Sequence, residues 1–241
     1  MAKPTPNLPV SYQEQLAQES ANIANQIQQP GGDRIRYSKA NQLVLPDGSE
    51  VDEIEGVILS FVSMNLFYDR DYDKNNPIPP ACFAIHQQPS LLTPSPNSPV
   101  IQVKNAGCNA CPNNQFGSRG KGKACKNTRQ YAFIPYEALA SGESDIWIGS
   151  VPVMSVRAFD SYVQLLATRH KTVPIGVKTL LSMDKEADYA SPRFKVVSPL
   201  DESDLKAAME LRQTALTRLM TEPDVSGYQP PPKAGRVAAR R

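Results

Sequence analysis

The sequence predicts an α+β protein made mainly of antiparallel strands, with a few helices appended. Segments rich in β-branched and aromatic residues outnumber segments with helical periodicity, and the two kinds do not alternate along the chain. One long segment, residues 77–130, is rich in Pro, Gly, Asn and Ser and has little periodicity. Because an OB-type barrel tolerates long insertions between its strands, we expect an OB-like core over residues 31–200 with an insertion at 77–130.

Residues 1–30 are expected to form an N-terminal arm that ends in an amphipathic helix. Ser11 and Glu14 fit a capping box. Apolar and small residues then recur at helical spacing as far as Ile27, and Pro30 ends the pattern. This helix either packs on the core or serves as an arm for a partner.

Strand patterns dominate the predicted core. Two short strands are expected within residues 35–51, joined by a turn at 46–48. A helix is expected to begin near Ser155, with Phe159 and Leu166 on its inner face. Further strands are expected at 56–68, 130–139, 145–153, 173–183 and 193–199.

The chain is expected to end in a helix, residues 201–221, and a flexible basic tail, residues 222–241. Acidic residues at the start of the helix suit the positive end of its dipole. Its predicted inner face carries Leu205, Met209, Leu216 and either Leu219 or Met220. The tail has four prolines, no periodicity and a cluster of basic residues at its end.

All four cysteines lie in or beside the predicted insertion. Cys108 and Cys111 form a Cys-x2-Cys pair, Cys125 follows, and Cys82 lies upstream. Four thiolates, two of them on a tight turn, are the ligand set of a structural Zn²⁺ site. His86 is the alternative to Cys82 as the fourth ligand, and disulfide bonds are the alternative to a metal.

The loop between the second and third cysteine is unusually basic. Overall charge is only +2, but no Asp or Glu occurs between Asp73 and Glu137. Lysine and arginine beside glycine suit contacts to phosphate, although they could instead balance the charge of metal-bound thiolates. Phe116 and Tyr131 are candidate stacking surfaces for unpaired bases. The predicted nucleic-acid contacts are therefore Phe116, Arg119, Lys121, Lys123, Lys126, Arg129 and Tyr131.

Other functions receive less support from the sequence. A zinc deaminase requires a His-x-Glu before its Cys-x2-Cys pair, and this sequence has none. The aspartates at 69, 71 and 73 are weak evidence for a catalytic metal site. No apolar run reaches the length of a membrane-spanning helix, and the N-terminus lacks an apolar signal core. We therefore expect a non-enzymatic protein without a membrane partner.

The segment CNACPNNQFGSRGKGKACKNTR, residues 108–129, resembles a family of tailed-bacteriophage proteins. Their pattern is Cys-x-x-Cys-Pro-x-Asn-x-aromatic-Gly-Ser followed by Gly-Lys-Gly-x-x-Cys-Lys. PPACF at 79–83 and SVRAFDSY at 155–162 extend the similarity, which runs from about residue 35 to residue 220. The chain also resembles, more remotely, phage single-strand binders that carry zinc within an OB barrel.

The resemblance implies a single-stranded DNA-binding protein of phage replication or recombination, present in the cytoplasm of the bacterial host. It also implies phage replication or transcription proteins as possible partners. One feature departs from many such binders: the chain ends in GRVAARR and not in an acidic tail. The alternatives are a zinc-knuckle adaptor that binds a protein partner in transcription or host takeover, and a zinc-dependent nucleic-acid enzyme.

Overall fold

The structure is a computed structural model that describes Tyr12, Gln15 and residues 33–71, 77–101, 103 and 106–231. The chain divides into two units, Met1–Asp33 and Arg34–Arg241. All of the described strands belong to the second unit. Tyr12 and Gln15 are helical, and the rest of the predicted N-terminal helix lies outside the described residues.

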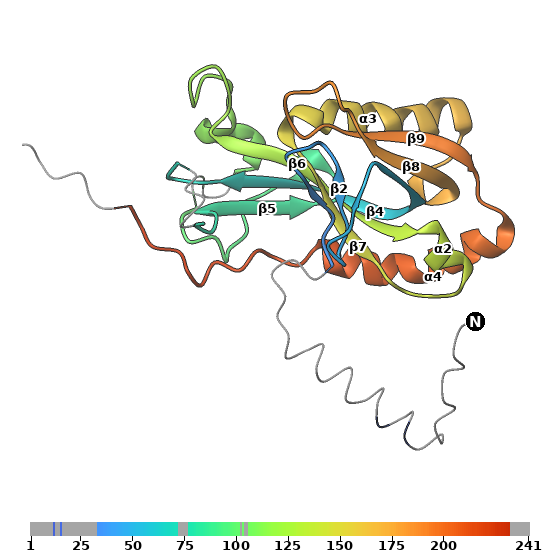
Figure 1. The fold of residues 1–241 in the computed structure, drawn as a ribbon. Helices are drawn as coiled ribbons and strands as arrows, with labels where there is room; N and C mark the ends of the chain where they lie inside the picture. The colour runs from blue at the N-terminus through green and yellow to red at the C-terminus, as the bar shows by residue number, and fades with distance from the viewer. Residues whose placement is uncertain are drawn as a thin grey trace, which may run out of the picture. The chain divides into compact units, whose positions relative to one another are not determined.

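A six-stranded antiparallel sheet forms the centre of the second unit (Figure 1). Its strands run in the order β7-β6-β4-β8-β9, and β5 also pairs with β4. The long strand β4 has β6 along one edge, whereas its other edge pairs with β8 over residues 53–56 and with β5 over residues 63–67. The strands are β4 (Glu53–Phe67), β5 (Cys82–His86), β6 (Cys125–Pro135), β7 (Trp147–Val151), β8 (Val177–Met183) and β9 (Pro192–Pro199).

A second, three-stranded sheet comes from the segment before β4. It consists of β1 (Arg36–Tyr37), β2 (Leu43–Val44) and β3 (Glu50–Val51), paired in chain order. The sequence predicts two strands here, and the structure has three. The predicted turn at 46–48 joins the last two of them.

Helices cover both faces of the large sheet. In Figure 1, α3 (Val156–Leu165) lies on one side and α4 (Glu202–Leu219) on the other, with the short α2 (Tyr136–Ala140) beside α4. A π-helical turn, Leu166–His170, continues α3. The residues of α2 fall within a predicted strand, which therefore ends at Pro135. Short 3-10 turns occur at Pro89–Leu91, Cys108–Ala110, Pro112–Asn114, Val153–Ser155 and Pro174–Gly176.

Strand alternation sends the side chains of β4 and β6 into two separate cores. Ile58, Tyr131 and Phe133 face α3 and the small sheet, whereas Val57 and Ile134 face α4 and α2. Because both faces are covered here, consecutive residues 57–59 of β4 and 131–134 of β6 are all apolar and buried. Among the described strands, β7 and β9 end the sheet and do not pair with each other, so the sheet is open. The predicted mixed, mainly antiparallel class is confirmed. The described strands form no closed barrel, so the predicted OB-type barrel is not confirmed.

The inner face of α4 differs in part from the prediction. Leu219 is buried and Leu216 packs against the core, as predicted, whereas Leu205 and Met209 are 37% and 48% exposed and Ala208 and Ala215 are buried. The small side chains of the two alanines let α4 lie close to β4 and β6. Asp201 caps the helix by accepting a hydrogen bond from the Asp204 amide (2.9 Å).

The first part of the predicted flexible tail contacts the folded unit. Glu222 accepts hydrogen bonds from Ser95 (2.6 Å) and Asn97 (2.7 Å), and the Tyr228 hydroxyl donates to Asp69 (2.5 Å). The tail therefore returns from α4 toward the end of β4. Residues 232–241, with their basic cluster, lie outside the described residues.

Candidate metal and nucleic-acid site

Strand register brings two of the four cysteines to one end of the sheet. Phe67, the last residue of β4, pairs with Cys82 of β5 on one side and with Cys125 of β6 on the other. Residues paired in this way point to the same face of a sheet. One row further in, Asn65 pairs with Ala84 and Asn127 and shares that face. We call this region the cysteine end. It consists of β5 and of residues 63–67 and 87–129.

The other two cysteines come from a tight turn that covers this face. The Cys111 amide donates to the Cys108 carbonyl oxygen (3.2 Å), and the Asn114 side chain donates to the same oxygen (2.9 Å). The Cys108 amide in turn donates to the Leu92 carbonyl oxygen (2.8 Å), which fixes the turn to the preceding segment. Pro112 begins the second 3-10 turn and suits its fixed φ.

All four thiols are buried and line one small cavity of about 20 Å³. The thiols are free, so the structure contains none of the disulfides considered as an alternative. His86, the alternative ligand, does not line this cavity and instead accepts a hydrogen bond at Nδ1 from the Gln88 amide (2.9 Å). Within the described ranges, no three His, Cys, Asp or Glu side chains stand at metal-binding spacing. A bound ion would therefore require the thiols to draw together around the cavity that they already share.

Cys108 and Cys125 are hard to ionise in these surroundings. Burial, with a smaller contribution from the neighbouring cysteines, raises the pKa of Cys125 to about 12 and that of Cys108 to about 11. A hydrogen bond from Asn65 to Cys108 and the positive charge of Lys123 near Cys125 act in the opposite direction. The cluster thus lacks the positive charge that four thiolates would need, and a divalent cation would supply it.

A short hairpin joins the turn to Cys125; we call residues 115–124 the basic hairpin. The Gly122 amide donates to the Arg119 carbonyl oxygen (3.0 Å) and the Arg119 amide donates back to Gly122 (3.3 Å). Gly120 in the tip has a φ of 58°, a left-handed value that glycine adopts readily. Ser118 accepts a hydrogen bond from the Ala124 amide (2.9 Å), which ties the tip to its base.

The basic side chains of this region differ in how they are held. Lys121 is exposed at the tip, and Arg119 forms an ion pair with Asp71. The Lys123 ammonium contacts the side-chain oxygens of Asn127 (3.2 Å) and Asn114 (3.4 Å), and it also lies 5.1 Å from the ring centre of Phe116.

Lys126 has a different partner and a different direction. Its ammonium lies 5.1 Å from the ring centre of Tyr68, and it points away from the face that carries Cys125 because successive strand residues alternate.

Phe116 is 81% exposed, which suits a stacking surface.

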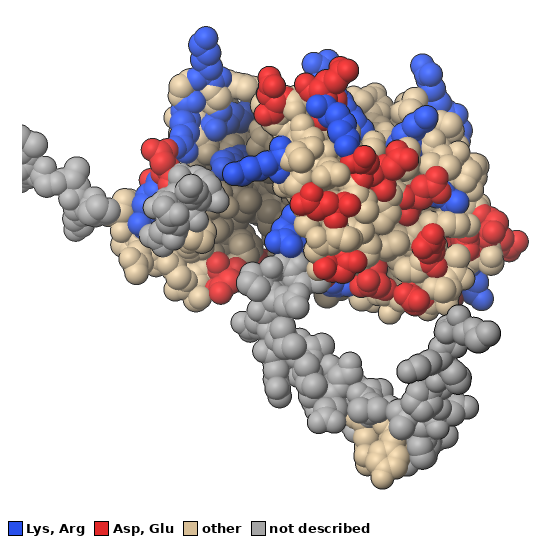
Figure 2. All heavy atoms as spheres, in the orientation of Figure 1, with Lys and Arg blue, Asp and Glu red and all other residues tan. Residues whose placement is uncertain are grey.

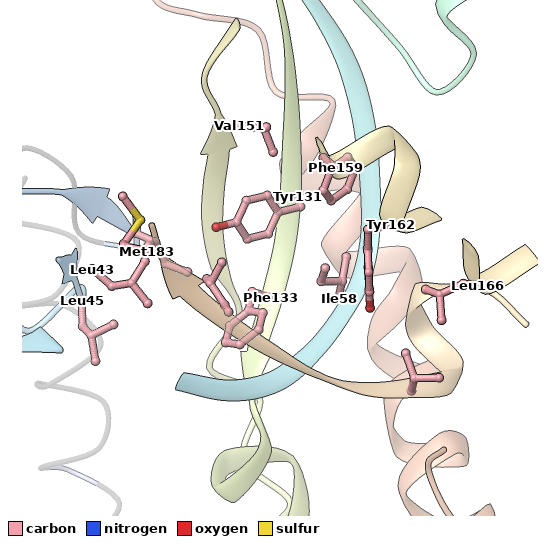
Figure 3. Close-up of a cluster of buried hydrophobic side chains, with 13 residues drawn as sticks. Leu43, Leu45, Ile58, Tyr131, Phe133, Val151, Phe159, Tyr162, Leu166 and Met183 are labelled. Atoms are coloured by element: carbon pink, nitrogen blue, oxygen red, sulfur yellow. The ribbon is translucent and has the colours of Figure 1, made fainter. Parts of the chain in front are cut away.

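Two of the predicted DNA contacts belong to the interior instead. Tyr131 is fully buried, and in Figure 3 its ring lies among Val151, Phe159 and Phe133. The ring packs against Gly149, its partner residue in β7, and a Cβ at that position would collide with it. The prediction of a stacking role for Tyr131 is wrong, because strand alternation directs this side chain into the core.

Arg129 is likewise committed within the fold. Its Nε and Nη2 donate to the two carboxylate oxygens of Asp160 (3.1 and 2.9 Å), and its side chain is only 12% exposed. This bidentate pair attaches α3 to β6. The prediction of a DNA contact is therefore not supported for Arg129, since a phosphate would have to displace a well-fitted carboxylate.

The carboxylates nearest to the cysteine end have partners among the basic and aromatic residues. Asp71 pairs with Arg119, and Asp69 accepts from Tyr228 and lies 3.8 Å from Arg70. No carboxylate of a described residue lines the thiol cavity. Asp73, the third aspartate of the loop, lies outside the described residues.

Sequence reasoning missed the polar residues that support the thiols. Asn65 and Asn114 are buried, and both bond to the cysteine turn or its neighbours. An asparagine close to the end of a strand segment that is mostly apolar is the signal that could have identified Asn65, because a buried amide needs partners.

Lysine and arginine side chains gather around one end of this unit. Figure 2 shows them beside a hollow at the end that carries the cysteines and the basic hairpin, whereas acidic side chains predominate over the rest of the face. No helix of the described residues is long and apolar enough to cross a membrane. Comparison with known proteins finds no matching family model and no significantly similar curated protein or solved structure.

Proposed function

We propose that this protein binds single-stranded DNA without catalysing a reaction, and that a zinc ion held by Cys82, Cys108, Cys111 and Cys125 orders the basic hairpin. The observation that carries the proposal is the meeting of four buried, free thiols at the base of a hairpin with exposed cationic and aromatic side chains. In this proposal the metal-bound thiols fix the base of the basic hairpin, and the hairpin exposes its lysine and arginine side chains to DNA.

The donor set fits Zn²⁺ better than other common metals. Thiolates are soft ligands, and four of them form a closed tetrahedral site. A cavity of about 20 Å³ has room for one atom-sized occupant. The absence of a carboxylate or histidine from the described lining leaves no obvious base beside the metal, which favours a structural role over a hydrolytic one.

The positive charge exceeds what the thiolates require. Lys123 lies close enough to Cys125 to influence its pKa, so it fits the charge-balancing alternative. Lys121 at the hairpin tip and Lys126 on the opposite strand face are turned outward instead. Phosphate contacts from such residues give affinity without sequence preference, and Phe116 adds a surface for base stacking.

The biological setting rests on the resemblance of residues 108–129 to tailed-bacteriophage proteins. On that basis, we propose a role in phage replication or recombination in the cytoplasm of the bacterial host. Replication or transcription proteins of the phage are the proposed partners.

A protein-binding adaptor is the second candidate, because the cysteine end also has an apolar surface. A cavity of about 520 Å³ is lined by Pro94, Pro96, Ile101 and Val103, and Leu91 beside it is 53% exposed. This surface lies apart from the basic hairpin. It could serve a partner in addition to DNA or in place of it.

The test is binding to a fluorescent oligo(dT) of about 20 nucleotides and to a duplex of the same length, over a salt series. We expect tighter binding to the single strand, with an affinity that falls steeply as salt rises. Affinity that is absent, or that is indifferent to salt, would contradict DNA binding and favour the adaptor.

A further inference from the structure

A second cavity, of about 600 Å³, lies beside the basic hairpin and is separate from the thiol cavity. Its described walls include four basic residues, one aromatic ring and one aliphatic side chain: Arg70, Arg119, Lys123, Lys126, Tyr68 and Ile78. This volume falls within the range of small-molecule sites in proteins. The combination of cations with an aromatic wall suits a ligand that has both an anion and a flat ring.

We propose that this cavity receives one nucleotide unit of the bound strand, with its phosphate at Lys123 and Lys126 and its base against Tyr68. The inference rests on the proposed function and specifies how the strand is recognised.

The charges of the cavity favour an incoming phosphate. Among the described residues, Lys123 and Lys126 form no ion pair with a carboxylate. Arg119 is paired with Asp71, but both side chains are largely exposed (48% and 90%), and such pairs contribute little. A phosphate can therefore replace Asp71 at Arg119 with little loss of free energy.

The remaining basic residue has an unused donor. Arg70 Nε is buried and donates no hydrogen bond within the described part of the chain, and its nearest carboxylate oxygen, on Asp69, is 3.8 Å away. A buried guanidinium nitrogen without a partner is energetically unfavourable. A phosphate or sugar oxygen in the cavity would satisfy it.

The aromatic wall lies next to the phosphate position. The Lys126 ammonium is 5.1 Å from the ring centre of Tyr68, so a phosphate on Lys126 brings its own base close to that ring. Ile78 continues the apolar surface. A base in a duplex is already paired and stacked, and it cannot enter without leaving the helix. The cavity would thereby favour single strands over duplexes.

The experiment compares oligo(dT) with an abasic oligonucleotide of the same length, which keeps the phosphates and lacks the bases. Tyr68→Ala should lower the affinity for oligo(dT) about tenfold, since one stacked base is lost, and should change the affinity for the abasic strand less than about twofold. Tyr68→Phe keeps the ring and should bind both strands as the wild type does. Tyr189→Ala, at a ring that is 45% exposed away from the cavity, is the matched control and should change neither affinity.

Each outcome decides the proposal. Equal losses for both strands, or no loss for either in a folded Tyr68→Ala variant with its full zinc content, would overturn the cavity assignment and leave DNA binding intact. A wild-type protein that binds neither strand would overturn DNA binding itself, and the cavity assignment with it.

Discussion

Thirteen buried apolar side chains pack on each face of the sheet in the body of the second unit, where α3 and α4 cover it. Among the described residues, the cysteine end has a separate cluster of three, Ala84, Leu92 and Cys108, and Met64 and Phe83 are also buried there. Its other buried residues include polar ones, among them Asn65, Asn114 and Ser98. The same strands, β4 and β6, run through both regions.

The difference suggests that the two ends of one sheet are stabilised by different interactions. In the body, apolar burial offsets the conformational entropy that folding removes. The cysteine end orders a long segment around a smaller set of apolar side chains. The proposed metal ion would add a second source of free energy there and would leave the surface free for charged side chains. Substitutions in each region should therefore have separable consequences.

Replacing Cys111 by Ser should unfold the cysteine end and leave the body folded. The substitution removes one of four proposed ligands from a region whose apolar cluster is much smaller than those of the body. Amide hydrogen exchange should show protection lost at β5 and at residues 107–125, and retained at β8. Protection that persists at β5 in a metal-free variant would show that the region does not need the ion.

Phe159→Ala should have the opposite pattern. The Phe159 ring lies 5.0 Å from that of Phe194 and 5.3 Å from that of Phe61, measured between centres, and it is fully buried. Urea denaturation should show a free energy of unfolding lower by about 3–5 kcal/mol. The zinc content of the folded protein should not change, and a variant that lost zinc while folded would show that the two regions are coupled.

Lys121→Glu should weaken binding to oligo(dT) about tenfold and reduce the slope of log affinity against log salt by roughly 0.7, the value for one phosphate contact to a single strand. The side chain is exposed at the hairpin tip, so the zinc content should stay the same. Lys206→Glu makes the same charge change on the exposed surface of α4 and serves as the control. Equal losses in both variants would mean that only net charge matters.

Asp71→Asn should strengthen binding by about two- to fivefold, because it releases Arg119 from an exposed ion pair. Glu143→Gln changes net charge equally at an exposed residue after α2 and is the control. If Asp71→Asn weakens binding, the ion pair positions Arg119 for DNA and does not compete with it.

The strands of the body could be predicted because buried and exposed residues alternate along them. β8 shows this well: its buried residues Val177, Thr179, Leu181 and Met183 are those that the pattern places on one side. The OB-type barrel was expected because the sequence does not reveal that helices cover both faces of the sheet and that its described end strands do not pair with each other. The inner face of α4 was predicted only in part, because large apolar residues were favoured over Ala208 and Ala215, whose small size permits close packing.

At the cysteine end, the residue types indicated the candidate ligands, but the sequence did not indicate which residues contact one another. The spacing of Cys108, Cys111 and Cys125 predicted residues that do line one cavity, together with Cys82. The strand β5 could not be predicted, because its five residues follow a proline run and become a strand through pairing with β4. The partner of Arg129 likewise depends on the position of α3, which no local pattern contains. Alternation puts Tyr131 on one face of β6, but only the fold shows that α3 covers that face.

The most direct test of the metal's role is the affinity for oligo(dT) before and after removal of metal by a chelator, with the zinc content measured on the same samples. We expect about one zinc ion per chain, an affinity that falls at least about a hundredfold when zinc is removed, and recovery when zinc is restored. A protein that is purified without zinc, with reduced cysteines, and binds the strand equally tightly would contradict the claim that a metal orders the basic hairpin.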